Sequence, residues 1–287
     1  MLLGFNMLLW STHVTEEHLS LFADIKRAGF DGVELPIFEG TPQHFEKVGK
    51  AIRDHGLRST AVTVIPDPQH DCASADPGVR SEGLKRLKWA IDCVAAAGGE
   101  TLCGPFYQPL GIFTGEPPTK SERANVVGVH KEAAAYAARH HVRLSVEPLN
   151  RFECYLLNTV ADAADVVRQV GAPNYGLLYD TFHANIEEKD PVGVIAPNIA
   201  HINHVHFSEN DRGAPGKGHV PWAATIKALK QGGYDSWCVI EAFGRALPDL
   251  AAATKVWRDL FPSPEDVYTK GIKFIKEQTA ATGGHCG

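Results

Sequence analysis

The chain has 287 residues, of which 44% are hydrophobic and 22% are charged, which is typical of a globular protein. A formal net charge of −6 argues against general binding to nucleic acid or to an anionic membrane surface. No apolar run approaches the roughly 20 residues of a transmembrane helix. The six cysteines include no C-x-x-C pair and predict reduced, cytoplasmic thiols rather than disulfides.

Short apolar runs alternate with amphipathic stretches along the whole chain, which is the pattern of a repeated strand–helix unit. The predicted strands are residues 2–7, 32–35, 58–64, 100–103, 143–146, 175–179, 202–207 and 237–240. The predicted helices include residues 16–28, 42–55, 78–97, 121–140, 159–170 and 264–282. Gly29, Gly56, Gly98 and Gly171 come directly after predicted helices, where glycine commonly terminates the helix.

Eight such strands, with no linker between halves, favour a single (β/α)8 TIM barrel with an extra C-terminal helix. We expect residues 1–262 to form the barrel core and residues 263–287 to form the C-terminal helix and tail. A doubly wound open sheet is the alternative. A glycine-rich phosphate loop would favour it, but neither G-x-G-x-x-G nor G-x-x-x-x-G-K-[ST] occurs.

Three carboxylates and one imidazole fall at the ends of four consecutive predicted strands. Glu147 follows the fifth strand, Asp180 the sixth and Glu241 the eighth, while the seventh runs into His206. In TIM barrels, functional side chains gather where strands meet the loops that follow them. No Lys or Arg ends these strands, so a divalent cation is the expected source of neutralising charge. The competing interpretation is that each acid only caps the next helix.

Oxygen ligands with one imidazole favour Mn²⁺, with Co²⁺ or Mg²⁺ as alternatives. Four protein ligands in an octahedral shell would leave two positions for water or substrate oxygens, which is typical of a catalytic metal. Glu34 ends the second predicted strand, and we interpret it either as a contact of the ligand or its surroundings or as a structural residue. His204, two residues before His206, is expected deeper in the barrel and not as a ligand.

Several strings around these residues carry a family resemblance. They are V-E-P-L-N-R-F-E, Y-D-T-F-H-A-N-I-E-E, H-V-H-F-S-E-N-D-R-G-A-P-G-K-G and V-I-E-A-F. With them the chain resembles the ketose 3-epimerases of the xylose-isomerase-like barrel superfamily. The resemblance implies that the metal ligands are Glu147, Asp180, His206 and Glu241, the same four residues that end the strands.

The resemblance further implies epimerisation of free ketoses at C3 by deprotonation and reprotonation through a cis-enediolate. Example pairs are D-fructose/D-allulose, D-tagatose/D-sorbose and ribulose/xylulose. Glu147 and Glu241 would also serve as the two acid/base carboxylates. The substrate contacts implied by the resemblance are Glu153, His183 and Arg212.

Three further residues near strand ends, Asn6, Thr63 and Phe243, are expected as parts of the pocket wall. The expected partner is a small sugar, and membership of this superfamily suggests a homodimer or homotetramer. The residues leave other activities open. These are an aldose–ketose isomerase such as hydroxypyruvate isomerase, an inosose dehydratase-like lyase, and a metal-stabilised binding barrel without catalysis.

Overall fold

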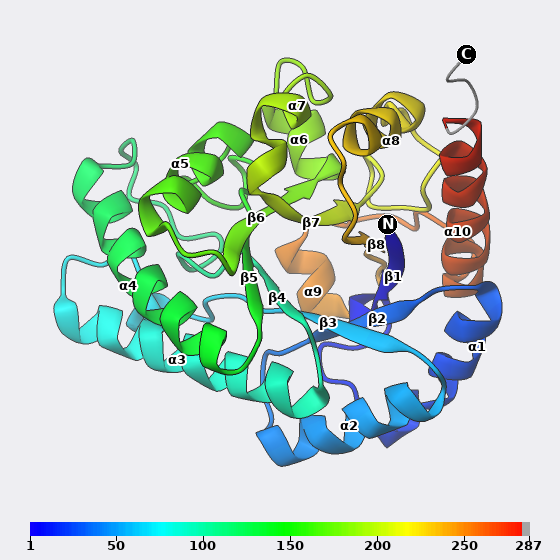
Figure 1. Ribbon diagram of the computed structural model, residues 1–287, viewed down its shortest axis with the longest axis horizontal. Coiled ribbons are helices and arrows are strands. Elements are labelled where there is room, and N and C mark those ends of the chain that lie inside the picture. Colours follow the sequence, from blue (N-terminus) through cyan, green and yellow to red (C-terminus); the bar gives the residue numbers. More distant parts are fainter. Residues whose placement is uncertain (283–287) are drawn as a thin grey trace.

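The computed structural model describes residues 1–282 and has eight parallel strands closed into a barrel in chain order (Figure 1). The strands are β1 (Leu2–Asn6), β2 (Gly32–Pro36), β3 (Arg58–Val62), β4 (Thr101–Gly104), β5 (Arg143–Val146), β6 (Tyr175–Asp180), β7 (Ile202–Phe207) and β8 (Trp237–Ile240). The prediction of a TIM barrel is confirmed.

Helices surround this barrel (Figure 1). The α-helices are α1 (Ser20–Ala28), α2 (Pro42–Asp54), α3 (Pro77–Ala97), α4 (Lys120–Arg139), α5 (Val160–Val170), α6 (Thr181–Glu187), α7 (Ile195–Asn198), α8 (Trp222–Gln231), α9 (Pro248–Ala253) and α10 (Pro264–Ala281). The 3-10 helices are η1 (Met7–Leu9), η2 (Glu16–His18), η3 (Pro68–His70) and η4 (Ile199–His201).

The predicted C-terminal helix is α10, which packs against both α1 and α8 and so completes the ring of helices (Figure 1). The predicted tail at residues 283–287 lies outside the described residues. Within residues 1–282, no helix has the length and apolar character needed to span a membrane.

Local signals set the helix boundaries. At the start of α5, the hydroxyl of Thr159 accepts from the backbone N–H of Asp162 at 3.1 Å, and the Asp162 carboxylate accepts from the backbone N–H of Thr159 at 3.3 Å. This reciprocal capping satisfies two N–H groups that the first turn leaves free. Gly171 ends the same helix with φ 66°, in the left-handed region that glycine adopts without steric cost.

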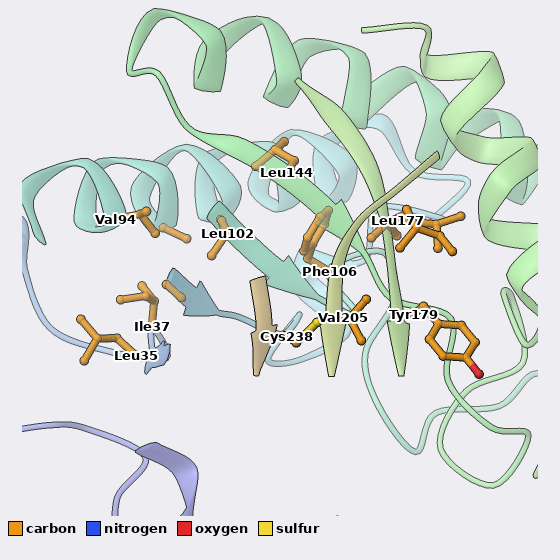
Figure 2. Packing of buried hydrophobic residues seen from close by; sticks show 14 of the residues in the cluster. Leu35, Ile37, Val94, Leu102, Phe106, Leu144, Leu177, Tyr179, Val205 and Cys238 are labelled. Atoms are coloured by element: carbon orange, nitrogen blue, oxygen red, sulfur yellow. The ribbon is translucent and has the colours of Figure 1, made fainter. Parts of the chain in front are cut away.

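Alternation along each strand separates the two sides of the barrel wall. Outward-facing residues such as Leu102, Leu144, Leu177 and Val205 are buried in the layer between strands and helices (Figure 2). Val94 of α3 belongs to the same layer (Figure 2). This apolar layer stabilises the barrel from outside, so the interior positions of the same strands are free to carry other side chains.

The N-terminal end of the barrel interior is filled by an aromatic side chain. Trp237 of β8 is 1% exposed, and a methyl group added at Gly32 of β2 would lie 2.6 Å from its ring. Glycine at this position therefore makes room for the indole. Because one end of the barrel is packed in this way, the polar interior residues collect toward the opposite end, where the strands meet the βα loops.

Candidate active site

Four buried side chains converge at the C-terminal end of the barrel. From Nδ1 of His206, the nearest carboxylate oxygens are 3.4 Å away on Glu241, 3.7 Å on Asp180 and 3.9 Å on Glu147. All four residues are at most 4% exposed. The structure thus brings together the four predicted metal ligands, with the imidazole nitrogen in the middle of three carboxylates.

Strand register explains this convergence. Asp180 of β6 lies opposite His206 of β7, and His206 lies opposite Val239 of β8, two positions before Glu241. Residues two apart on a strand point to the same face, so Glu241 continues the inward face of Val239. In the same way, Glu147 follows the inward Ser145 of β5. The sequence pattern of strand ends therefore translates directly into one cluster.

Asp180 also caps a helix. Its Oδ1 accepts from the backbone N–H groups of Phe182 at 2.5 Å and His183 at 3.2 Å, at the start of α6. Its Oδ2 faces Nδ1 of His206 instead. The capping interpretation and the ligand interpretation are thus compatible for this residue, because each uses a different oxygen.

One cation reaches the carboxylates from the loop after β7. Arg212 adopts φ 68° and is 3% exposed. Its Nη1 lies 2.8 Å from Glu241 Oε2 and 3.4 Å from Asp180 Oδ2. The guanidinium carbon also stacks 3.8 Å from the ring centre of Phe182 and 4.8 Å from that of Phe243. No Lys or Arg ends these strands, but the loop after β7 brings the guanidinium of Arg212 to the same carboxylates.

The donor set fits a divalent cation. Nδ1 of His206 is buried without a hydrogen-bond partner among residues 1–282, while its Nε2 is 2.7 Å from Glu34 Oε1. Such an unpaired buried nitrogen is costly unless a ligand completes it. Three carboxylates beside the single guanidinium of Arg212 leave two negative charges uncompensated. A cation of charge two would balance them.

In the metal-free protein, bound protons instead of a cation reduce the negative charge of the cluster. Burial raises the pKa of Glu147 well above its usual value, and the carboxylates of Glu241 and Asp180 raise it further against the opposing effect of His206. Although burial opposes its charged form, the carboxylates of Glu34 and Glu241 hold the pKa of His206 well above its usual value. Cation binding at these atoms therefore releases protons.

These shifts predict that the metal-free protein becomes less stable as the pH rises above about 7. The folded state keeps the protons of Glu147 and His206 above the ordinary pKa values of 4.5 and 6.5. Buried histidines with lowered pKa values, such as His183, oppose this effect only at lower pH, where the unfolded chain protonates them. Above about pH 7 the folded state binds more protons than the unfolded chain, so the free energy of unfolding falls with increasing pH. Melting in chelator at about pH 7 and about pH 8.5 checks this. A Tm that stays level or rises would contradict it.

His183 links Asn150 to Arg212 at the edge of the cavity. Its Nδ1 lies 3.0 Å from both the backbone nitrogen and Nδ2 of Asn150, and its Nε2 lies 2.9 Å from Nη2 of Arg212, which only donates. Burial, together with the charge of Arg212, lowers the pKa of His183 to about 3, so the ring is neutral. Nε2 also lies 3.8 Å from Glu147 Oε1, so the ring stands between the guanidinium and this carboxylate.

A cavity of about 160 Å³ lies over this cluster. Its polar lining consists of Glu147, Glu153, His183, Arg212, Glu241 and Thr254. Its apolar lining consists of Leu8, Phe38, Val62, Val64, Pro105, Leu110, Leu149, Phe243, Leu250 and Ala253. The volume is below that of pockets for drug-sized ligands, roughly 300–1,000 Å³, and therefore suits one small molecule with a polar side and an apolar side.

The predicted pocket-wall residues occupy different positions. Phe243 lines the cavity. Asn6 is fully buried below it and donates from Nδ2 to Glu241 Oε1 at 3.1 Å. Thr63 is also buried, and its hydroxyl donates to the backbone oxygen of Ile37 at 2.7 Å, so it supports the β2–α2 connection rather than facing the cavity.

Two supporting residues did not emerge from the sequence. Asn150 orients His183 and also donates from Nδ2 to Glu153 Oε1 at 2.8 Å. Glu209 is fully buried and accepts from Trp222 Nε1 and three backbone N–H groups, which shapes the loop that carries Arg212. Asn150 lies three residues before Glu153, and Glu209 lies three residues before Arg212. This adjacency to the motif residues is the signal that could have identified them.

Comparison with known proteins agrees over nearly the full chain. A family model described as xylose isomerase-like TIM barrel matches residues 22–278. A probable ketose 3-epimerase of Synechocystis sp. is 32% identical, covering 96% of this chain and 95% of the relative. A ketose 3-epimerase of Arthrobacter globiformis is 31% identical, covering 98% of both. The D-allulose 3-epimerase of Methylomonas sp. in complex with D-allulose has a TM-score of 0.90 at 30% identity, covering 97% of both chains.

Proposed function

The chain belongs to the xylose isomerase-like TIM barrel family and within it to the ketose 3-epimerases, and on that premise we propose that it epimerises free ketoses at C3. One observation carries the proposal. Three carboxylates surround the unpaired Nδ1 of His206 at the floor of a small cavity with one polar side. That arrangement supports a cation site beneath a small polar substrate.

In this proposal Glu147, Asp180, His206 and Glu241 hold a divalent cation. When bound, the cation supplies positive charge that stabilises negative charge developing on the substrate oxygens. His206 binds through Nδ1, since its Nε2 is engaged by Glu34 at 2.7 Å. The donor set of three carboxylates and one imidazole favours Mn²⁺, with Co²⁺ or Mg²⁺ as alternatives.

Glu147 and Glu241 carry the proton. They line the same cavity from β5 and β8, two strands that do not pair with each other in the barrel. One carboxylate accepts the proton from C3, and the other returns a proton to the opposite face of the same carbon.

Three further side chains bind and orient the sugar. Arg212 donates from its guanidinium, Glu153 accepts from a hydroxyl group, and the imidazole of His183 contacts a sugar oxygen. Their support is that all three line the cavity and that Asn150 fixes the directions of His183 and Glu153. The apolar lining opposite them excludes water from the carbon skeleton.

Replacing Glu153 with Gln should weaken the use of substrate. A hydrogen bond to a charged group contributes about 1.5–3 kcal/mol, so kcat/KM should fall about 10- to 150-fold. Steady-state kinetics measure this fall, and the KM should rise more than kcat drops. The matched control is Glu187→Gln, because Glu187 pairs with Arg151 outside the cavity. Equal kinetics for the Glu153 variant and the wild type would exclude the contact.

The finer parts of the proposal are a cytoplasmic location, a homodimer or homotetramer, and a barrel core of residues 1–262 with a C-terminal helix and tail in residues 263–287. The location is supported by five cysteines, which are all buried and unpaired within residues 1–282. The described residues hold Cys72, Cys93, Cys103, Cys154 and Cys238.

A ketose panel tests the proposal. The Mn²⁺-loaded protein is incubated with D-fructose, D-tagatose and ribulose, and the products are separated by chromatography. We expect the C3 epimer of at least one sugar. Formation of aldoses alone would favour the aldose–ketose isomerase, loss of water would favour the lyase, and no conversion of any sugar would favour a binding barrel.

A further inference from the structure

A second buried cluster lies directly beneath the candidate cation site. At its centre is Glu34 of β2, which is fully buried. Its carboxylate accepts from five side chains: Asn6 Nδ2 at 3.0 Å, Thr60 Oγ1 at 2.9 Å, Cys103 Sγ at 3.3 Å, His204 Nε2 at 2.7 Å and His206 Nε2 at 2.7 Å. With five donors around it, this buried carboxylate acts only as an acceptor.

The hydrogen bond between Glu34 and His206 determines which ring nitrogen of His206 is free to bind a cation. An ionised carboxylate only accepts, so the proton of a neutral His206 must be on Nε2, where Glu34 binds it. Nδ1 is then left with a lone pair directed at the three carboxylates of the rim. A carboxylate that binds the remote N–H in this way also makes the ligating nitrogen more basic.

A second link runs through Asn6. Its Oδ1 accepts from the backbone N–H of Leu8 at 2.8 Å, which sets the orientation of the amide. Its Nδ2 therefore points at carboxylates, donating to Glu34 Oε1 at 3.0 Å and to Glu241 Oε1 at 3.1 Å. Glu34 is thus connected to two of the four candidate ligands, to His206 directly and to Glu241 through one amide.

The lower cluster could itself be taken for a metal site, because Glu34, Cys103, His204 and His206 place ligand atoms within 4.8 Å of one another. The distances argue against it. Bonds of about 2.0–2.2 Å in a tetrahedral site hold nitrogen and oxygen ligands roughly 3.3 Å apart or more. Both histidine nitrogens are only 2.7 Å from Glu34, which is a direct hydrogen bond.

We propose that Glu34 is a positioning residue that directs His206 Nδ1 and the Glu241 carboxylate toward the cation. The inference rests on the proposed cation site and adds the residue that organises it. Glu34 does not line the cavity, so it acts through its two neighbours.

Glu34→Gln tests the proposal by calorimetric titration of the metal-free protein with Mn²⁺. An amide has one acceptor and one donor end, so it cannot accept from both histidines. If its donor end faces Nε2 of His206, the His206 proton moves to Nδ1 and blocks the ligating lone pair. Loss of such a supporting carboxylate typically costs about 10- to 100-fold in metal affinity, and we expect the Kd to rise by that factor. The bound Mn²⁺ should also give an altered electron paramagnetic resonance spectrum.

Thr60→Val is the matched control, because it removes one donor to Glu34 but touches no candidate ligand. Its Kd should stay within about threefold of the wild type. Asn6→Ser is the second test variant should Glu34→Gln not fold, since serine can still cap Leu8 but cannot bridge two carboxylates. It should raise the Kd several-fold.

Three outcomes are informative. Weaker binding by Glu34→Gln or, if that variant does not fold, by Asn6→Ser supports the proposal when the melting temperature of the metal-free variant is retained. Wild-type affinity in a folded Glu34→Gln or, if that variant does not fold, in Asn6→Ser overturns the positioning role and leaves the cation site standing. A wild type that binds no Mn²⁺, Co²⁺ or Mg²⁺ overturns both.

Discussion

Replacing Glu147 with Gln should lower kcat for ketose epimerisation by about 10²- to 10⁴-fold, the usual contribution of a positioned acid or base. The amide has nearly the shape of the carboxylate but can neither take up a proton nor carry charge to a cation. Glu147 faces both the cavity and Nδ1 of His206, so the substitution removes two roles at once. Single-turnover kinetics with the metal-loaded variant measure the loss.

The same variant should be more stable than the wild type when metal is absent. Burial and the nearby carboxylates of Glu241 and Asp180 raise the pKa of Glu147, so its charged form is unfavourable in the empty site. An uncharged amide avoids this cost, and the Tm at about pH 8 in chelator should rise. Full activity in the variant would exclude Glu147 as an acid or base. A lower metal-free Tm would contradict the electrostatic account of the site.

Removal of the cation should abolish turnover and lower the melting temperature together. At a free metal concentration 100 times Kd, a cation that binds only the folded state adds about 2.7 kcal/mol to the free energy of unfolding. For a chain of 287 residues, this corresponds to a Tm about 4–5 °C higher. Dialysis against a chelator, followed by reloading with Mn²⁺, Co²⁺ or Mg²⁺, measures both effects.

Glu147→Gln and Glu241→Gln are the controls for that experiment, since each lacks one candidate ligand. Their Tm should respond less to added metal than that of the wild type. Chelator-treated protein that retains full turnover would exclude a cation from the reaction. A metal response that is unchanged in both variants would place the cation at other residues.

The barrel and its rim could be predicted from the sequence because two simple periodicities govern them. Strand residues alternate between the apolar helix side and the interior, so an acid that ends an apolar run, such as Glu147 or Glu241, projects into the barrel mouth. The same alternation explains why His204 lies below His206, bonded to Glu34. The observed strand boundaries differ only slightly from the predicted ones. For example, the strand predicted at residues 100–103 is β4, Thr101–Gly104.

Loop-borne contacts could not be predicted in the same way. The guanidinium of Arg212 reaches Asp180 and Glu241 only because its backbone adopts φ 68° in the loop after β7, a conformation that no local pattern signals for arginine. The Glu34–His206 contact joins residues 172 positions apart. It depends on how β2 and β7 face each other across the closed barrel, and a strand end alone does not specify that pairing.

The central claim is inversion at C3 through removal and return of a proton. The most direct test is ¹H and ²H NMR of a ketose incubated with the metal-loaded protein in D₂O. We predict deuterium at C3 of the epimeric product, absence of deuterium elsewhere, and loss of the signal with Glu147→Gln. Two results would contradict the account. One is movement of the carbonyl between C1 and C2 without exchange at C3, and the other is a C3 epimer that carries no deuterium at C3.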